Sequence, residues 1–207
     1  MSDVHEEFRR LGTATVYEAS GREGLVDLQF EQLIPGSRAS GPARTVRCGQ
    51  GDNLMVHAVM ERVEPGDVVV LTMPEPEPVA LVGELLATQA RGRGAAALLV
   101  DAAVRDVEEL RELGLLLWAR WIRVRGADKG AVGTIDGQVE VGGATIRAGD
   151  TIVLDADGVV VVRQERLEAV CAAARERAEG EFAKRAKLSA GALSYDLDGL
   201  RERVEDP

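Results

Sequence analysis

Three apolar runs of strand length alternate with helical patterns between residues 67 and 121, and no other feature constrains the fold so strongly. The runs are DVVVLTM, AAALLVD and LLLWARW; the helical patterns are GELLATQARGRG and VEELREL. Strands that alternate with helices are typical of βαβ units, whose strands run parallel. We therefore expect an α/β fold with a parallel sheet in this region.

The rest of the chain is expected to add a β-rich half and flanking helices. Residues 127–162 contain strand patterns with turn dipeptides at Asp136-Gly137, Gly142-Gly143 and Asp157-Gly158. The patterns also predict two short helices in residues 2–20 with Thr13 as an N-cap, a long amphipathic helix at 164–187 and a short one at 190–204. The segment PEPEPVAL at 74–81 is expected to be an exposed loop, because prolines exclude a central strand or a helix interior. No stretch has the composition of a flexible linker, so we expect one domain over residues 1–207.

Charge and cysteine content exclude several classes of function. The formal net charge is −10 and there is no basic block, which argues against nucleic-acid binding. Cys48 and Cys171 lie far apart, in no metal-ligand spacing, as expected for a cytoplasmic protein in a reducing compartment. The N-terminus lacks the apolar region of a secretory signal, and no apolar run approaches the ~20 residues that cross a membrane.

Arg105 and Asp106 stand together where the second apolar run gives way to a helix. Residues at the C-terminal ends of parallel strands face the crevice in which α/β proteins bind ligands. A simpler interpretation is that Asp106 and Glu109, in D-x-x-E spacing, form a capping box, with Arg105 a solvated surface charge. The local pattern leaves both interpretations open.

The stretch GELLA at 83–87 opens the preceding helix. The first N–H groups of a helix lack internal partners and carry partial positive charge, and Gly83 would let an anion approach the backbone. Gly83 could equally be a simple loop breaker. Taken with Arg105, a bidentate carboxylate binder, and with Asp106 and Glu84 as acids that could bind a cation, the two stretches predict a site for a small 2-oxo acid.

Several motifs resemble the RraA-like fold family, and within it the class II pyruvate aldolases. They cover most of residues 13–200 and comprise GDNL (51–54), PGDVVV (65–70), GELLA (83–87), VDAAVRDVEEL (100–110), GG (142–143), AGDTIVLDADGVVVV (148–162) and KLSAGALSYDL (187–197). The resemblance implies a swivelling β/β/α domain that forms homotrimers or homohexamers, with helices 164–207 in oligomer contacts and the active site between subunits. It also implies cleavage of 4-hydroxy-4-methyl-2-oxoglutarate or 4-carboxy-4-hydroxy-2-oxoadipate to pyruvate and a second oxo acid, with oxaloacetate decarboxylation as a side activity.

The resemblance also assigns roles to residues. Backbone amides of Gly83, Glu84, Leu85 and Leu86 would hold the pyruvoyl group, and Arg105 would bind substrate. Asp106 would anchor a divalent metal, Mg²⁺ with Mn²⁺ or Co²⁺ as alternatives, while Glu84 and Glu181 of a neighbouring subunit would act on it through waters. Catalysis would then rest on Arg105, Glu84 and Asp106.

The sequence departs from the family's pattern at two places. The family commonly has glycine where this chain has Ala102, and the proline-rich loop 74–78 is unusual; both bear on the choice of substrate.

Two other functions are considered. Some relatives regulate an RNA-degrading enzyme by binding it, which is the alternative function. A methyltransferase is disfavoured, because prolines and acids follow the strand VVVLTM where a glycine-rich loop would be needed. His57 is expected to be structural or partly exposed, and the role of Lys129 stays undecided.

Overall fold

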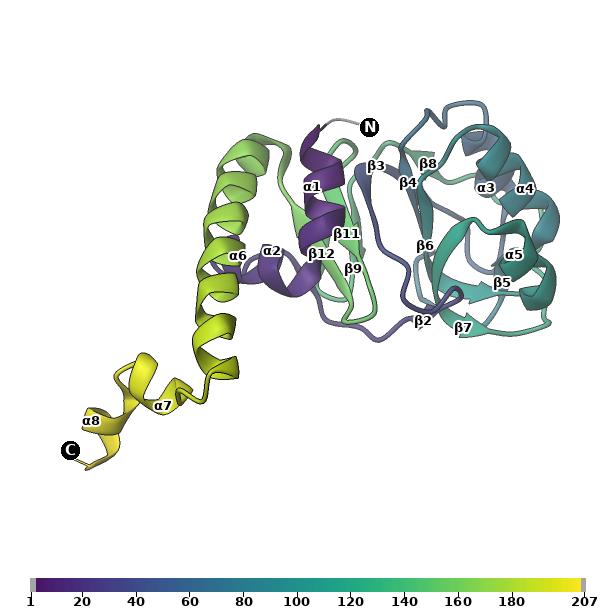
Figure 1. The fold of residues 1–207 in the computed structure, drawn as a ribbon. Coiled ribbons are helices and arrows are strands. Elements are labelled where there is room, and N and C mark those ends of the chain that lie inside the picture. Colours follow the sequence, from purple (N-terminus) through teal and green to yellow (C-terminus); the bar gives the residue numbers. More distant parts are fainter. Residues whose placement is uncertain (1–2, 206–207) are drawn as a thin grey trace.

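A curled β-sheet lies between two layers of helices in the structure, a computed structural model that describes residues 3–205 (Figure 1). The parallel part of the sheet has the order β3 (Ala39–Arg47), β4 (Val68–Thr72), β6 (Ala97–Val104) and β7 (Leu116–Ile122). All eight residues of β6 are buried, which explains why this central strand is an almost continuous apolar run. The predicted parallel arrangement is confirmed.

Three helices cover one face of this parallel part. They are α3 (Leu54–Val59), α4 (Glu84–Gly92) and α5 (Val107–Leu113). Alternate residues of β6, such as Leu98 and Val100, pack with buried residues of these helices into one apolar cluster. The side chains of Leu99 and Trp118 belong to a second cluster on the opposite face. The sheet is therefore buried on both faces, and its strand ends are the places left for chemistry.

The second half of the chain contains the strands β8 (Thr134–Ile135), β9 (Val139–Val141), β10 (Ala144–Ile146), β11 (Thr151–Leu154) and β12 (Val159–Val162). Buried residues of β9 to β12 belong to the second cluster, on that opposite face. β9–β10 and β11–β12 are antiparallel hairpins that turn at Gly142-Gly143 and Asp157-Gly158, as predicted. Asp136-Gly137 joins no paired strands, because β8 pairs with β3 instead. The short strands β1 (Leu25–Val26) and β2 (Glu31–Gln32) pair with β12 and β7 at the ends of the sheet.

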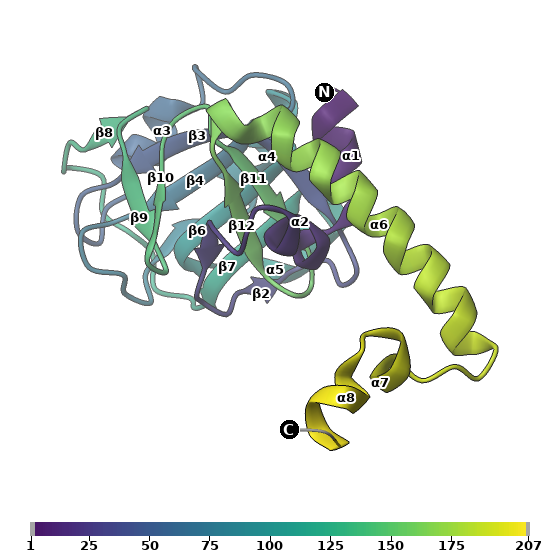
Figure 2. The ribbon, with the colours of Figure 1, turned by 90° about the vertical axis from the view of Figure 1, so that its left-hand side faces the viewer.

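The outer layer of helices lies against β11 and β12. It contains α1 (Asp3–Leu11), α2 (Thr13–Ala19) and the long α6 (Leu167–Ser189), which follows a 3₁₀ turn at Gln164–Arg166. Only the first part of α6 is buried, at Val170, Cys171 and Ala174, and the rest extends beyond the body (Figures 1 and 2). Two short helices, α7 (Ser194–Leu197) and α8 (Leu200–Glu205), follow where one was predicted. No helix within residues 3–205 is long and apolar enough to span a bilayer.

Three local predictions are wrong. The N-cap of α2 is Gly12, while Thr13 donates its backbone N–H and its hydroxyl to the Asp155 carboxylate at 2.8 and 2.5 Å. The loop predicted at 74–81 ends earlier, because Ala80–Val82 form the buried strand β5 after the last proline. The apolar run that was predicted as a strand over 95–101 does not end at the buried Asp101; β6 continues to Val104, and Ala102 lies inside it in the core.

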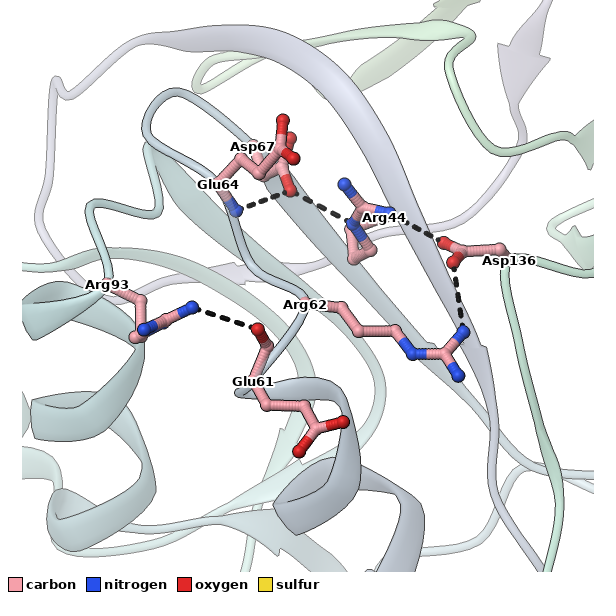
Figure 3. A network of polar contacts seen from close by, with 7 residues as sticks. All are labelled: Arg44, Glu61, Arg62, Glu64, Asp67, Arg93 and Asp136. Atoms are coloured by element: carbon pink, nitrogen blue, oxygen red, sulfur yellow. Dashed lines mark hydrogen bonds and ion pairs between the residues drawn. The ribbon is translucent and has the colours of Figure 1, made fainter.

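A polar network holds the turn before β4 against β3 and the loop after β8 (Figure 3). The buried Asp67 carboxylate accepts hydrogen bonds from Arg44 Nε and from the Glu64 backbone N–H, both at 3.0 Å. Arg44 also contacts Asp136 at 3.0 Å, and the more exposed Arg62 reaches the same carboxylate at 3.5 Å. Asp67 is therefore the buried anchor of the network, and Arg62 is its solvent-exposed edge.

Replacing Asp67 with alanine should lower the free energy of unfolding by about 2–3 kcal/mol, because Arg44 and the Glu64 N–H lose a buried partner. For a chain of this length, that corresponds to a fall in Tm of about 4–12 °C. Arg62→Ala should cost less than about 1 kcal/mol, since exposed ion pairs contribute little. Urea titration of both variants measures the difference, and equal losses would contradict this account of the network.

Candidate functional site

Two strand ends bring the two predicted stretches together. β5 runs parallel to β6, with Ala80 opposite Ala103 and Val82 opposite Val104. Gly83 follows β5 and Arg105 follows β6, so α4 and α5 begin next to each other at the same edge of the sheet. The predicted convergence of the two stretches on one place is confirmed, although the strand before Gly83 begins where the sequence predicts a loop.

Asp106 turns its carboxylate away from its own helix. Its backbone is left-handed, with φ 60° and ψ 48°, a conformation that aspartate tolerates better than most residues. The side chain makes no capping hydrogen bond to α5, and Oδ2 accepts the backbone N–H of Glu84 at 3.0 Å. The capping-box interpretation is therefore wrong, because the carboxylate lies at the N-terminus of the neighbouring helix α4, whose dipole favours an anion.

Two glycines make room for the charged side chains. A Cβ on Gly83 would lie 2.3 Å from Asp106 Oδ2 and 3.3 Å from Arg105 Nε. A Cβ on Gly126 would lie 2.9 Å from Arg105 Nη1. Gly83 has extended backbone, so the space it leaves, rather than its conformational freedom, is what the site requires.

Arg105 lies beside Asp106 but does not form a hydrogen bond with it. Its Nε is 3.8 Å from Asp106 Oδ2, longer than a hydrogen bond, and its side chain is 49% exposed. Both residues line a cavity of about 230 Å³, a volume suited to a small acid. The guanidinium therefore keeps donors for a ligand carboxylate.

Most of the predicted binding residues meet at this cavity. Gly83, Leu85 and Leu86 line it together with Arg105 and Asp106. The N–H groups of Leu85 and Leu86 lie in the first turn of α4, where a helix supplies no internal acceptor.

Glu84 is the predicted site residue that the structure places differently. Its side chain is not part of the cavity lining; one carboxylate oxygen accepts the hydroxyl of Thr88, one turn along α4, at 2.9 Å. Only its backbone N–H, which is bound to Asp106, belongs to the site in this conformation.

The other lining residues had not been predicted as site residues. They are Asn53, His57, Ala80, Gly126, Ala127 and Lys129. His57 is exposed, within the expectation of a structural or partly exposed residue, and it lies on the cavity wall. GDNL is a motif of the resemblance, but nothing in its spacing indicates that Asn53 lines the same cavity as Arg105. The loop after β7 supplies Gly126, Ala127 and Lys129, and its course depends on contacts between distant parts of the sequence.

The cavity offers a divalent metal a single carboxylate, that of Asp106. The described residues contain no group of three or more His, Cys, Asp or Glu side chains placed to hold an ion. Asp106 alone suits Mg²⁺, which usually keeps several waters and binds through one or two carboxylates, and does not suit the closed ligand sets of structural zinc. Glu181 lies on α6, paired with Arg177 at 2.9 Å, on the opposite side of the body from α4 and α5 (Figure 1). It therefore does not reach Asp106 within one chain.

Comparison with known proteins identifies relatives over nearly the whole chain. The family described as RraA-like, Aldolase/RraA, matches residues 3–161. A protein of Halalkalibacterium halodurans, provisionally named a 4-hydroxy-4-methyl-2-oxoglutarate aldolase, is 32% identical over 189 residues, which are 90% of this chain and 89% of the relative. The matched region includes β5, β6 and the starts of α4 and α5, so the site belongs to the shared part.

Two solved structures are similar at about the same level of identity. The RNA-processing inhibitor RraA of Thermus thermophilis is 30% identical, with a TM-score of 0.66, over 72% of this chain and 91% of that one. A Geobacillus kaustophilus protein described as an S-adenosylmethionine:2-dimethylmenaquinone methyltransferase is 31% identical, with a TM-score of 0.68, over 73% and 94%.

The loop after the first parallel strand bears on the methyltransferase description. This strand is β3, not β4 as assumed above, and Gly49-Gln50-Gly51 follow it. A Cβ on Gly49 would lie 2.3 Å from the Cβ of Ala131, so the space above the loop is filled by protein. Gly49 therefore serves packing, whereas Gly51 has a left-handed backbone with φ 62°. The sequence match, the curled sheet and the relatives together show that the chain belongs to the Aldolase/RraA family and has the RraA-like fold.

Proposed function

We propose that the protein cleaves a 4-hydroxy-2-oxo acid, of the 4-hydroxy-4-methyl-2-oxoglutarate or 4-carboxy-4-hydroxy-2-oxoadipate type, to pyruvate and a second oxo acid. The observation that carries the proposal is the meeting of Arg105, Asp106 and the first turn of α4 at one small cavity. Such a site offers a guanidinium, free backbone donors and a carboxylate to a ligand that bears a carboxylate next to a carbonyl. The named relative from Halalkalibacterium halodurans supports the same reaction class.

The reaction is a retro-aldol cleavage. A base removes the proton of the C4 hydroxyl, the C3–C4 bond breaks, and C4 becomes the carbonyl carbon of the second product. The bonding electrons pass to C3 and onto the 2-oxo oxygen, giving the enolate of pyruvate, which takes a proton at C3 to become the methyl group. Decarboxylation of oxaloacetate forms the same enolate, so we propose it as a side activity.

The residues of the cavity match these charges. Arg105 pairs with the C1 carboxylate and fixes its plane, and the N–H groups at the start of α4 hold the pyruvoyl oxygens. Asp106 would hold a divalent cation, Mg²⁺ being the best match to one carboxylate, with Mn²⁺ or Co²⁺ as substitutes. When bound, that cation supplies Lewis-acid stabilisation of the developing enolate charge.

Glu84 is the proposed partner in proton transfer. In the structure its carboxylate is held by Thr88, so it would have to leave this hydrogen bond to approach the substrate. General acid–base groups contribute about 10²–10⁴-fold to rates, which sets the scale of its role.

We further propose that the protein is a homo-oligomer whose subunits meet at the site. Arg105 and Asp106 also line a second, open hollow of about 400 Å³ with Ile122 and Val124. Val124, which lines this hollow, and Leu85, which lines the cavity, are 88% and 81% exposed, which is unusual for apolar residues next to a polar site. A second copy that covers them, aided by the exposed C-terminal helices, would close the site.

The alternative is a non-catalytic regulator that binds an RNA-degrading enzyme. The observation in its favour is the similarity to the Thermus RraA, which is described as an RNA-processing inhibitor. A regulator would have no need of an intact Arg105–Asp106 pair beside a free helix N-terminus, so a test of activity separates the two functions.

Pyruvate release tests the proposed function. The purified protein with Mg²⁺ should release pyruvate from 4-hydroxy-4-methyl-2-oxoglutarate and from oxaloacetate, as followed by coupled oxidation of NADH. Exhaustive EDTA treatment should lower both rates at least about 100-fold, because the enolate loses its Lewis acid, and Mg²⁺ should restore them. Full activity after metal removal would exclude the metal-dependent mechanism, and no release with any of the three cations would favour the regulator.

A further inference from the structure

We propose that an ion pair inside the sheet, between Asp101 and Arg120, positions the end of β6 that bears the site. Asp101 Oδ1 accepts a hydrogen bond from Arg120 Nη1 at 2.9 Å. Asp101 lies buried within β6, ahead of Arg105, and Arg120 lies on the neighbouring strand β7. The expected effect on catalysis rests on the proposed function, whereas the expected effect on strand register does not.

β6 contains one residue more than β7 over the same length. Val100 lies opposite Ala119, and the next registered pair is Ala103 opposite Trp121. Three steps along β6 therefore match two along β7, which defines a β-bulge. The strand also changes its other neighbour here, because β4 pairs with it up to Val100 and β5 pairs with it from Ala103. The bulge is therefore the point at which β6 leaves β4 and enters the part of the sheet that bears the site.

The ion pair holds the last residues before the shift in register. Asp101 follows Val100 and Arg120 follows Ala119, so a contact between them continues the first register by one step. Ala102 is then the extra residue of the bulge. The pair thereby marks the position along β6 at which the second register begins.

Arg120 contacts residues on both sides of the bulge. Besides its hydrogen bond to Asp101, its guanidinium carbon lies 4.6 Å from the centre of the Trp121 ring, within the range of a cation–π interaction. Trp121 is the residue of β7 that lies opposite Ala103, the first residue of β6 in the second register. One side chain therefore ties the end of the first register to the start of the second.

The register beyond the bulge decides where the site residues point. The N–H groups of Ala103 and Arg105 donate to the carbonyl oxygens of Val79 and Val82 at 3.0 and 3.1 Å. Without the bulge, the chain at Arg105 would lie about 3.3 Å further along the strand direction, and its side chain would point to the opposite face. An error of register would therefore take the guanidinium out of the cavity.

The burial of Asp101 argues that the pair serves register rather than stability. Burial raises the pKa of the Asp101 carboxyl group, and the hydrogen bond from Arg120 offsets this only in part. The charged carboxylate therefore costs free energy that an apolar residue would avoid. Buried ion pairs are often no more stabilising than apolar residues of similar size, and the fixing of register is their best-attested use.

The test replaces the pair by apolar residues. In the double variant Asp101→Leu/Arg120→Met, Tm should not fall, because no charge is left buried without a partner. The value of kcat/KM for pyruvate release from 4-hydroxy-4-methyl-2-oxoglutarate should nevertheless fall about 30-fold, since one charged hydrogen bond shifts the balance between two registers by roughly that factor. Amide hydrogen exchange at Ala103 and Arg105 should become at least about tenfold faster, because the slipped register loses their acceptors on β5. Arg120→Lys keeps the cation and should retain most of the activity.

The ion pair between Asp150 and Arg163 provides the matched control. Its side chains are 3% and 30% exposed, against 4% and 28% for Asp101 and Arg120. Asp150 lies beside the start of β4, at the opposite end of the parallel strands from the site. Asp150→Asn should lower Tm and leave kcat/KM unchanged, whereas Asp101→Asn, which keeps only a neutral acceptor for Arg120, should lower kcat/KM about fivefold.

Other outcomes would overturn the proposal or its basis. Wild-type kcat/KM and exchange in the double variant would show that other contacts set the bulge. Equal losses of activity in Asp101→Asn and Asp150→Asn would show a general effect of stability, and this comparison decides if the double variant does not fold. A wild-type protein that releases no pyruvate would remove the proposed function, and the exchange rates alone would then decide whether the pair fixes the register.

Discussion

Replacing Asp106 with asparagine is expected to lower kcat/KM for pyruvate release about 10³-fold while leaving the fold intact. Asparagine is nearly isosteric, tolerates the left-handed backbone at this position and can still accept the Glu84 N–H through its amide oxygen. What it removes is the negative charge that would hold the divalent cation. Loss of that charge removes several kcal/mol of enolate stabilisation, and each 1.36 kcal/mol corresponds to about tenfold in rate.

The measurement is steady-state cleavage at saturating Mg²⁺, with Tm as the readout of folding. Asp157→Asn is the matched control, because Asp157 is an exposed acid in the β11–β12 turn, far along the chain from the site. Its activity should equal that of the wild type. An Asp106→Asn protein with more than about a third of wild-type activity would exclude Asp106 as the metal anchor.

Gly83→Ala should be the second severe change, with a loss of about 10²-fold in kcat/KM and little change in Tm. The added Cβ would lie 2.3 Å from Asp106 Oδ2, so the carboxylate must move. It can do so at small cost to the fold, because the Asp106 side chain is 41% exposed. The site then loses the hydrogen bond from Glu84 N–H to Asp106, and displacements of about 1 Å in catalytic groups cost about 10²-fold.

Gly92→Ala provides the control at the other end of the same helix. Nothing lies within 4 Å of a Cβ built there, so this substitution should leave activity unchanged. If Gly83→Ala proves fully active, the carboxylate position seen here is not the one that the reaction uses. A fall in Tm that parallels the loss of activity would instead show that Gly83 is required for the folding of α4.

Sequence patterns predicted the fold and the site correctly where the local preference of a segment matches the structure that the segment adopts in the folded protein. The parallel strands, the hairpins at Gly142-Gly143 and Asp157-Gly158, and the meeting of Gly83 with Arg105 and Asp106 all followed from periodicity and turn residues. The resemblance to the aldolase family added the assignment of roles to those residues. Each strand, helix and turn is encoded by a local pattern, and the order of strands and helices along the chain is enough to predict that their ends meet.

The parts that escaped prediction depend on distant contacts. β5 is only three residues long and follows three prolines, and it is a strand because β6 supplies its hydrogen bonds. Asp106 has the spacing of a capping box, yet its carboxylate binds α4, which no pattern around residue 106 could show. Lys129 lines the cavity from a loop in which the N–H groups of Gly130 and Ala131 donate to the Asp52 carboxylate, 78 and 79 positions earlier in the chain. Sequence spacing carries no trace of these contacts.

The left-handed backbone of Asp106 has a consequence for how relatives of this protein can diverge. A left-handed position is open at low cost to aspartate, asparagine and glycine, whereas most other residues lose roughly 1–2 kcal/mol there. A lineage that abandons catalysis can therefore drop the carboxylate in one step, to asparagine or glycine, without disturbing the turn into α5. We expect substitutions at this position to be dominated by those two residues, so that the boundary between enzymes and non-catalytic relatives is readable from a single column of a sequence alignment.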